Sequence, residues 1–124
     1  MNQKRILVLD DDLIVTEIIG QLVKNLGFYP VIAHNAPILA TAKMKEFDAV
    51  VLDLWLSDSS AYESLQALAD QGFRGVILLI SGLEESALDE ACSQGRALGL
   101  RIVGYLRKPI DTQSFNALLR EAEL

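Results

Sequence analysis

At 124 residues the chain has the length of a single domain, and its apolar fraction of 51% is enough for a packed core. A formal charge of −6, with eleven Lys and Arg scattered along the chain, argues against a surface that binds nucleic acid or anionic lipid. One cysteine excludes an internal disulfide, no apolar run approaches the roughly 18 residues of a membrane span, and no signal-peptide pattern opens the chain, so we expect a cytoplasmic protein.

Short apolar runs alternate with amphipathic stretches along the whole chain. A short continuous apolar run indicates a buried strand, whereas apolar residues three and four apart indicate a helix. In chain order we expect a strand at 6–9, a helix at 13–26, a strand at 28–33, a helix at 36–46, a strand at 49–52, a helix at 61–71, a strand at 76–80, a helix at 84–98, a strand at 101–106 and a helix from 112. This alternation predicts an α/β fold of the (βα)5 type, with a parallel sheet and helices on both faces.

The helix ends carry recognisable signals. Asp12, Asn35 and Asp111 precede predicted helices and are expected to cap them, because Asp and Asn side chains accept hydrogen bonds from free backbone amides there. Gly27 and Gly72 follow predicted helices and are expected to end them.

Three other features have simple structural interpretations. Ile14, Ile18 and Leu22 recur at helical spacing and are assigned to the core. His34 follows a strand without a His/Cys cluster that would support zinc, and is assigned to the surface or to a supporting contact. Cys92 lies in a predicted helix and is assigned as a small apolar residue.

Polar residues follow four of the predicted strands: Asp10 and Asp11 the first, Asp53 the third, Ser81 the fourth and Lys108 the fifth. Because the carboxyl ends of parallel strands form the usual ligand site, we expect these side chains in one cavity. Several carboxylates there would repel one another, and Mg²⁺, which takes carboxylate, water and phosphate oxygens, relieves that repulsion. With a lysine and a hydroxyl added, the group can stabilise a phosphoryl group in transfer to a carboxylate.

Four segments in this order resemble the motifs of the response-regulator receiver domain of two-component signalling. They are ILVLDDD at 6–12, VLDL at 51–54, LISG at 79–82 and YLRKP at 105–109. The resemblance spans essentially the whole chain and implies one receiver domain at residues 1–124. It also implies the flavodoxin-like receiver fold, with strand order 2-1-3-4-5.

The resemblance implies a phosphoacceptor and a metal site. Asp53 would accept a phosphoryl group from a sensor histidine kinase or a histidine phosphotransfer protein. Asp11 and Asp53 would bind Mg²⁺ directly, together with the backbone carbonyl of Trp55. Asp10 would act mainly through a metal-bound water.

The resemblance also implies a switch. Lys108 and the Ser81 hydroxyl would contact the phosphoryl group, and Pro109 would hold Lys108 in place through a bond that is commonly cis. Ser81 would move toward the phosphoryl group, and Tyr105 would rotate into the vacated space. The output surface, which could also form a homodimer, would consist of the last two helices and the strand between them, within residues 84–124.

The chain departs from the family at positions near the predicted site. Ser57 stands where a proline is usual and Ala61 where a glycine is usual, so we expect the loop at 58–60 to follow a different path. Trp55 and Leu83 are bulky and offer no base beside the acceptor. Slow self-dephosphorylation is therefore expected.

The segment between Ser81 and Lys108 is longer than usual, mainly at 91–101. In this it resembles receivers attached to cyclic-di-GMP phosphodiesterase (EAL-type) output domains. The receiver itself would be a signalling domain, and any enzymatic activity would lie in such an output domain.

Three rival functions fit part of the pattern. A flavodoxin-like flavin binder needs a hydroxyl- or glycine-rich phosphate loop after the first strand, where this chain has three aspartates. An aspartate-based phosphatase has a second Asp two residues after its nucleophile, where this chain has Trp55. A phosphorylation-independent pseudo-receiver, acting only as a protein-interaction module, is the main alternative because of Ser57 and Ala61. The joint presence of the carboxylates and the lysine argues against it.

Overall fold

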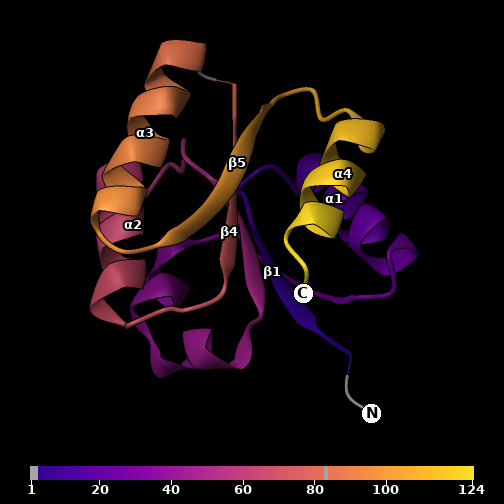
Figure 1. Cartoon of the computed structure of the whole chain (residues 1–124), viewed down its shortest axis with the longest axis horizontal. Coiled ribbons are helices and arrows are strands. Elements are labelled where there is room, and N and C mark those ends of the chain that lie inside the picture. Colours follow the sequence, from indigo (N-terminus) through magenta and orange to yellow (C-terminus); the bar gives the residue numbers. More distant parts are fainter. Residues whose placement is uncertain (1–2, 83) are drawn as a thin grey trace.

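The computed structural model describes residues 3–82 and 84–124, and its centre is a five-stranded parallel sheet (Figure 1). The strands are β1 (Arg5–Leu9), β2 (Tyr29–Ala33), β3 (Ala49–Asp53), β4 (Val76–Ser81) and β5 (Arg101–Arg107). Their order is β2-β1-β3-β4-β5, and every neighbouring pair is parallel. The predicted strands and their order are confirmed.

Four α-helices cover the two faces of the sheet: α1 (Leu13–Asn25), α2 (Ala61–Asp70), α3 (Glu85–Ala97) and α4 (Thr112–Glu121). Figure 1 shows α2 and α3 on one side of the sheet and α1 and α4 on the other. Side chains that alternate along the strands therefore enter two separate cores. Leu7, Leu52 and Leu79 pack with α2 and α3, whereas Val8, Val51 and Leu78 pack with α1 and α4. No described helix combines the length and apolar character that crossing a bilayer requires.

The prediction of one helix at 36–46 is wrong. The segment forms two short 3-10 helices, η1 (Ala36–Ala40) and η2 (Ala42–Glu46), separated by an extended Thr41. The Thr41 hydroxyl donates to the Ile38 carbonyl at 2.8 Å, which is the kind of local side-chain bond that competes with a continuous helix. Leu39 and Met44 are both fully buried, yet five residues of α-helix would turn them about 140° apart. The break lets both residues reach the core.

The predicted caps are confirmed at two of three helices. The Asp12 carboxylate accepts from the amides of Ile14 and Val15, and Asp111 accepts from the Ser114 amide. Asn35 makes no side-chain capping bond. The carboxylate of Asp58, from the loop after β3, instead accepts from the Ala36 amide. Gly27 and Gly72 follow α1 and α2 with φ of 90° and 66°, the left-handed conformation that favours glycine after a helix.

The predicted core face of α1 is wrong for Ile14 and Ile18, whereas Leu22 is partly buried and packs against the core as predicted. Ile14 and Ile18 are 69% and 51% exposed, whereas Ile19 and Val23 are buried with Thr16 and Gly20. At 3.6 residues per turn, Ile14 and Ile18 lie nearly opposite the buried face. The helix carries more apolar residues than its buried face can hold. Gly20 faces the sheet, where Ile32 of β2 comes close to it and leaves little room for a side chain.

Candidate metal site at the carboxyl edge of the sheet

Three carboxylates meet where β1 and β3 end. Leu9 of β1 pairs with Leu52 of β3, so the next residues, Asp10 and Asp53, leave neighbouring strands at the same level. One oxygen each of Asp10, Asp11 and Asp53 lies within 4.8 Å of the other two. Asp10 and Asp53 are 0% and 2% exposed, and Asp11 is exposed. The structure thus brings together the acidic residues that follow two different strands.

Lys108 brings a positive charge to the same place. Its Nζ lies 2.7 Å from Asp10 Oδ2 and 3.3 Å from Asp53 Oδ2. The Lys108 amide donates to the Ser81 carbonyl at 2.9 Å, and this bond holds the loop that carries the lysine. The Lys108–Pro109 peptide bond is cis. One ammonium group therefore faces two buried carboxylates.

Each carboxylate also accepts a hydrogen bond from a backbone amide. The Asp12 amide donates to Asp10 Oδ1 at 2.9 Å, the Trp55 amide donates to Asp53 Oδ1 at 3.0 Å, and the Ser57 amide donates to Asp11 Oδ2 at 3.0 Å. Sequence reasoning missed all three. The first two have the two-residue spacing of Asx turns, which an aspartate at the end of a strand could have indicated. The third joins residues 46 apart and has no local signal.

The site is short of positive charge. Burial and the neighbouring charge of Asp10 raise the pKa of Asp53 from 3.8 to about 6, although the Trp55 amide and Lys108 act in the opposite direction. Burial alone would lower the pKa of Lys108, but its contacts with Asp10 and Asp53 outweigh this and raise it. Asp10 Oδ2 is buried, and its partner is the Lys108 ammonium, 2.7 Å away, which Asp10 shares with Asp53. A divalent cation with a preference for oxygen fits this donor set.

The cluster opens to solvent through a pocket of about 400 Å³. The residues that line it are Asp11, Asp12, Asp53, Trp55, Ser81, Gly82 and Lys108. Ser81 is buried at the end of β4, and the Trp55 side chain is 70% exposed. Leu83, the other bulky residue expected beside the acceptor, lies outside the described residues.

Tyr105 lies on β5, one strand beyond Ser81, and its side chain is half-buried. Its hydroxyl donates to Glu85 Oε1 at 3.0 Å, so the ring is tied to the first turn of α3. Burial and the carboxylates of Glu85 and Asp89 raise the pKa of Tyr105 to about 12. The tyrosine therefore remains a neutral donor at any physiological pH.

Ala61 does not strain the loop after β3, although an alanine in place of the usual glycine was expected to change its path. Ala61 is the first residue of α2, and the one described non-glycine residue with a positive φ is Glu123. Ser60 caps the helix by accepting from the Glu63 amide, while the Glu63 carboxylate accepts from the Ser60 amide. The alanine thus stands where a helix begins, and needs no left-handed conformation.

The remaining residues singled out in the sequence lie elsewhere. His34 Nε2 is 3.4 Å from the Thr16 hydroxyl, which agrees with a supporting contact. Cys92 is buried in α3 among apolar residues, as expected.

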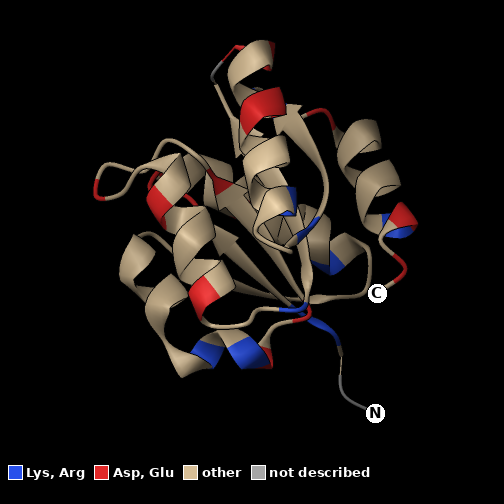
Figure 2. Ribbon diagram, turned by 60° about the vertical axis from the view of Figure 1, so that its left-hand side comes forward, with Lys and Arg blue, Asp and Glu red and all other residues tan. Residues whose placement is uncertain are grey.

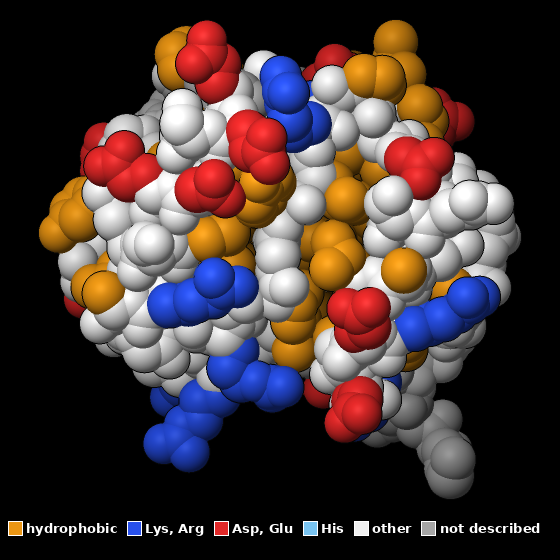
Figure 3. All heavy atoms as spheres, turned by 45° about the horizontal axis from the view of Figure 1, so that its top comes forward, with side chains coloured by type: hydrophobic (Ala, Val, Ile, Leu, Met, Phe, Trp, Pro, Cys, Tyr) orange, Lys and Arg blue, Asp and Glu red, His pale blue; other side chains and the backbone are white. Residues whose placement is uncertain are grey.

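Charge is distributed unevenly over the molecule. Lysines and arginines lie near the start of several strands, at Lys4, Arg5, Lys45, Arg74 and Arg101. Figure 2 shows many of the basic residues toward the end that carries the N-terminus, and Figure 3 shows several acidic side chains in the upper part of the face that it presents. A negative carboxyl edge attracts cations to the aspartates.

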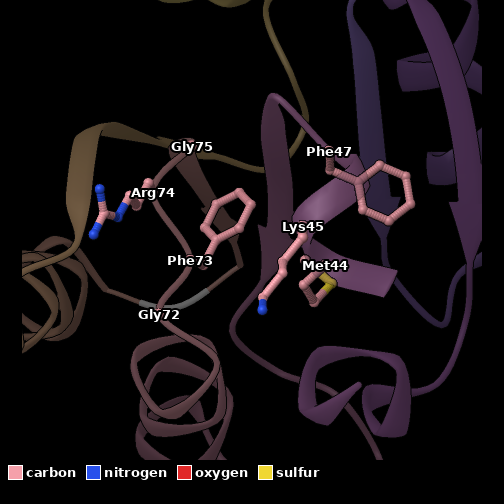
Figure 4. Close-up of a pocket in the computed structure, with 7 residues that line it drawn as sticks. All are labelled: Met44, Lys45, Phe47, Gly72, Phe73, Arg74 and Gly75. Carbon is pink, nitrogen blue, oxygen red and sulfur yellow. The ribbon is translucent and has the colours of Figure 1, made fainter. Parts of the chain in front are cut away.

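A second hollow, of about 270 Å³, lies at the amino edge (Figure 4). It is lined by Met44, Lys45, Phe47, Gly72, Phe73, Arg74 and Gly75. Among these residues there is no carboxylate or hydroxyl. The hollow therefore lacks a phosphoacceptor and metal ligands.

Comparison with known proteins agrees with this geometry. The family model of the response regulator receiver domain matches residues 6–120. The chain belongs to this family. Its curated relatives include the transcriptional regulatory protein CpxR of Escherichia coli K12, at 28% identity over 94% of this chain and 47% of CpxR. They also include a putative NtrX-like response regulator of Rickettsia typhi, at 27% identity over 98% of this chain and 25% of that protein.

Solved structures show the same fold. A chain of the CheX–CheY complex with beryllofluoride and Mg²⁺ from Borrelia burgdorferi matches with a TM-score of 0.82 and 17% identity, over 98% of this receiver and 90% of that chain. The receiver spans about a quarter to about half the length of the curated relatives named above. Receiver domains are signalling domains that work with histidine kinases or phosphotransfer proteins and bind Mg²⁺ at an acidic site, and the cluster described above matches such a site.

Proposed function

We propose that this chain is a single receiver domain in which Asp53 accepts a phosphoryl group in a Mg²⁺-dependent reaction. The observation that carries the proposal is the buried Asp53 carboxylate, with one oxygen toward Lys108 and two further aspartates within 4.8 Å. The donor is a sensor histidine kinase or a histidine phosphotransfer protein. A pseudo-receiver that acts only by binding proteins has no use for three carboxylates gathered around one lysine.

The aspartates provide the ligands that Mg²⁺ prefers. Asp11, Asp53 and the Trp55 carbonyl would hold it directly, and Asp10 would act through a metal-bound water. When bound, the ion would offset part of the negative charge of the carboxylates and of the phosphoryl oxygens. The raised pKa of Asp53 supports this assignment because it indicates that Lys108 and the backbone amide do not fully balance the charge of the buried carboxylates.

In the transfer, an Asp53 oxygen forms a bond to phosphorus while the bond from phosphorus to the donor's imidazole nitrogen breaks. The electron pair of that bond stays with the imidazole. Lys108 and the Ser81 hydroxyl stabilise the charge on the phosphoryl oxygens. The Trp55 amide fixes Asp53 Oδ1, so the carboxylate is oriented before the donor arrives.

The phosphorylated form carries nearly two negative charges where one carboxylate stood. Ser81 then moves toward the phosphoryl oxygens, and Tyr105 turns inward behind β4. The surface of α3, β5 and α4 changes with it and serves a homodimer or an attached output domain. An output domain accords with the greater length of the relatives, and any enzymatic activity lies there, with the EAL type as one prediction.

The exposed apolar residues of α1 support a donor-binding surface beside the site. Three apolar residues of α1 are at least half exposed: Leu13, Ile14 and Ile18. The helix begins directly after Asp12, which lines the pocket. An apolar surface next to a charged centre is suited to another protein.

The proposal is tested by titrating the protein with Mg²⁺ and beryllofluoride while recording the fluorescence of Trp55, the one tryptophan of the chain. Beryllofluoride mimics a phosphoryl group on a carboxylate. A saturable change that requires both components, and that is absent in Asp53→Asn, supports phosphoryl acceptance. No response to either component would favour the pseudo-receiver.

Trp55 is expected to slow the loss of the phosphoryl group. Its side chain is at the rim of the pocket and brings no base for an attacking water. Trp55→Asn should therefore accelerate dephosphorylation several-fold, because water gains access and a polar group to orient it. The measurement is the decay of the aspartyl phosphate after removal of the donor. Fast decay of the wild type, little changed by the substitution, would contradict this role.

The bond between Tyr105 and Glu85 is expected to favour the unphosphorylated form. Glu85→Ala removes the acceptor and frees the ring to turn inward, which should tighten beryllofluoride binding about five-fold, as expected for a hydrogen bond of about 1 kcal/mol. The pKa of Tyr105 should fall at the same time. Glu84→Ala is the matched control, since the Glu84 side chain makes no capping bond. Equal beryllofluoride affinities of the two variants would show that the Tyr105–Glu85 hydrogen bond does not favour the unphosphorylated form.

A further inference from the structure

The exposed Asp11 carboxylate is held by a distant backbone group. The Ser57 amide donates to Asp11 Oδ2 at 3.0 Å across a separation of 46 residues. Within residues 3–82 and 84–124, this is the one hydrogen bond or ion pair of the Asp11 side chain. Without it, the carboxylate would be free to turn into solvent, where its charge is better hydrated than beside Asp10 and Asp53.

The loop that presents this amide is fixed on both sides. Leu56 is buried and pairs with Ser59 in an isolated antiparallel bridge, so Ser57 and Asp58 form the two-residue turn between them. Asp58 is tied in turn to the Ala36 amide at the start of η1. The position of the Ser57 amide is therefore set by contacts that do not involve Asp10, Asp11 or Asp53.

A carboxylate held through one oxygen keeps the other for a metal ion. We propose that the Ser57 backbone amide is a positioning group, which holds Asp11 in its metal-binding arrangement before the ion arrives. The inference rests on the proposed Mg²⁺ site and adds to it a donor specific to this chain, because the proline that is usual at this position of the family has no N–H. Partners that orient a ligand in this way contribute about 10- to 100-fold to metal affinity.

The chain permits an unusually direct test, because the donor belongs to the backbone. Ser57→Pro removes the N–H, whereas Ser57→Ala keeps it and removes only the hydroxyl. Proline suits the first position of a two-residue turn, and the preceding Leu56 is extended, as residues before proline prefer. No positive φ occurs at Ser57, which is one condition for a proline there.

Affinity for Mg²⁺ is measured through Trp55 fluorescence and, independently, by isothermal titration calorimetry without a phosphodonor. Ser57→Pro should weaken binding by about 10-fold, and Ser57→Ala by less than about two-fold. Equal affinities in the two variants would overturn the inference.

A second pair of variants separates positioning from damage to the loop. Asp11→Ala alone weakens Mg²⁺ binding, and adding Ser57→Pro should then weaken it no further, because the amide acts through Asp11. An additional loss in the double variant would show that the proline acts by distorting the loop, and would also overturn the inference. Failure of the wild type to bind Mg²⁺ at all would instead refute the proposed function.

Discussion

Asp53→Asn is expected to stabilise the metal-free protein at pH 8 by up to about 3 kcal/mol. The pKa of Asp53 is about 6 in the folded protein against 3.8 ordinarily, so folding opposes its ionisation. Each unit of that difference corresponds to about 1.4 kcal/mol. Asparagine resembles the protonated carboxyl in size and charge, and it relieves the repulsion with Asp10. The measurement is the free energy of unfolding by urea in the presence of a chelator.

The raised pKa of Asp53 determines how the free energy of unfolding changes with pH. Between about pH 4 and 6 the folded state binds more protons at Asp53 than the unfolded state, so the contribution of this group to stability falls as the pH rises. The advantage of the variant should thus be absent near pH 4 and complete above about pH 7. Saturating Mg²⁺ should stabilise the wild type and remove the advantage. Glu17→Gln, which removes an exposed charge from α1, is the control. A variant less stable than wild type at pH 8 without metal would contradict the charge balance described above.

Lys108→Met is expected to lower the rate of phosphorylation by about 10²- to 10³-fold. The ammonium lies within 3.3 Å of Asp53 and faces the place of the incoming phosphoryl group, and the loss of one such stabilising group typically has an effect of that size. The pKa of Asp53 should rise further, because Lys108 is one of the groups that lower it. The optimum of the reaction should therefore move to higher pH. Rates are measured with acetyl phosphate and Mg²⁺ over a range of pH.

Arg107→Met provides the matched control for this variant. Arg107 is adjacent and exposed, and forms no ion pair within the described part of the chain. Its loss changes the net charge equally without touching Asp53. A similar fall in rate for both variants would mean that Lys108 acts only through general attraction of the anionic donor.

The sequence was sufficient to predict the sheet and to predict that aspartates far apart in the chain lie close together. The three central strands, β1, β3 and β4, are built on continuous apolar runs, and a parallel sheet brings the ends of its central strands together. Asp10, Asp53 and Lys108 could thus be assigned to one place before any coordinates were known. The roles of these residues in catalysis stay predictions until they are tested.

The predictions from sequence fail where the local pattern of apolar residues allows two structures and tertiary packing decides between them. Residues 13–26 contain two apolar stripes, and the packing of α1 on the sheet, with Gly20 close to Ile32 of β2, buries Ile19 and leaves Ile18 exposed. In residues 36–46 the burial of both Leu39 and Met44 outweighs a helical pattern. The Ser57 amide could not be assigned to Asp11, because a backbone donor leaves no trace in the residue type.

The most direct test of phosphoryl acceptance is labelling with acetyl phosphate and Mg²⁺, followed by intact-mass measurement and peptide mapping. The wild type should gain one phosphoryl group, on the peptide that contains Asp53, and lose it on treatment with hydroxylamine. Asp53→Asn, folded as shown by its circular dichroism, should gain none. Labelling of that variant at the wild-type rate, or of the wild type without Mg²⁺, would contradict the account.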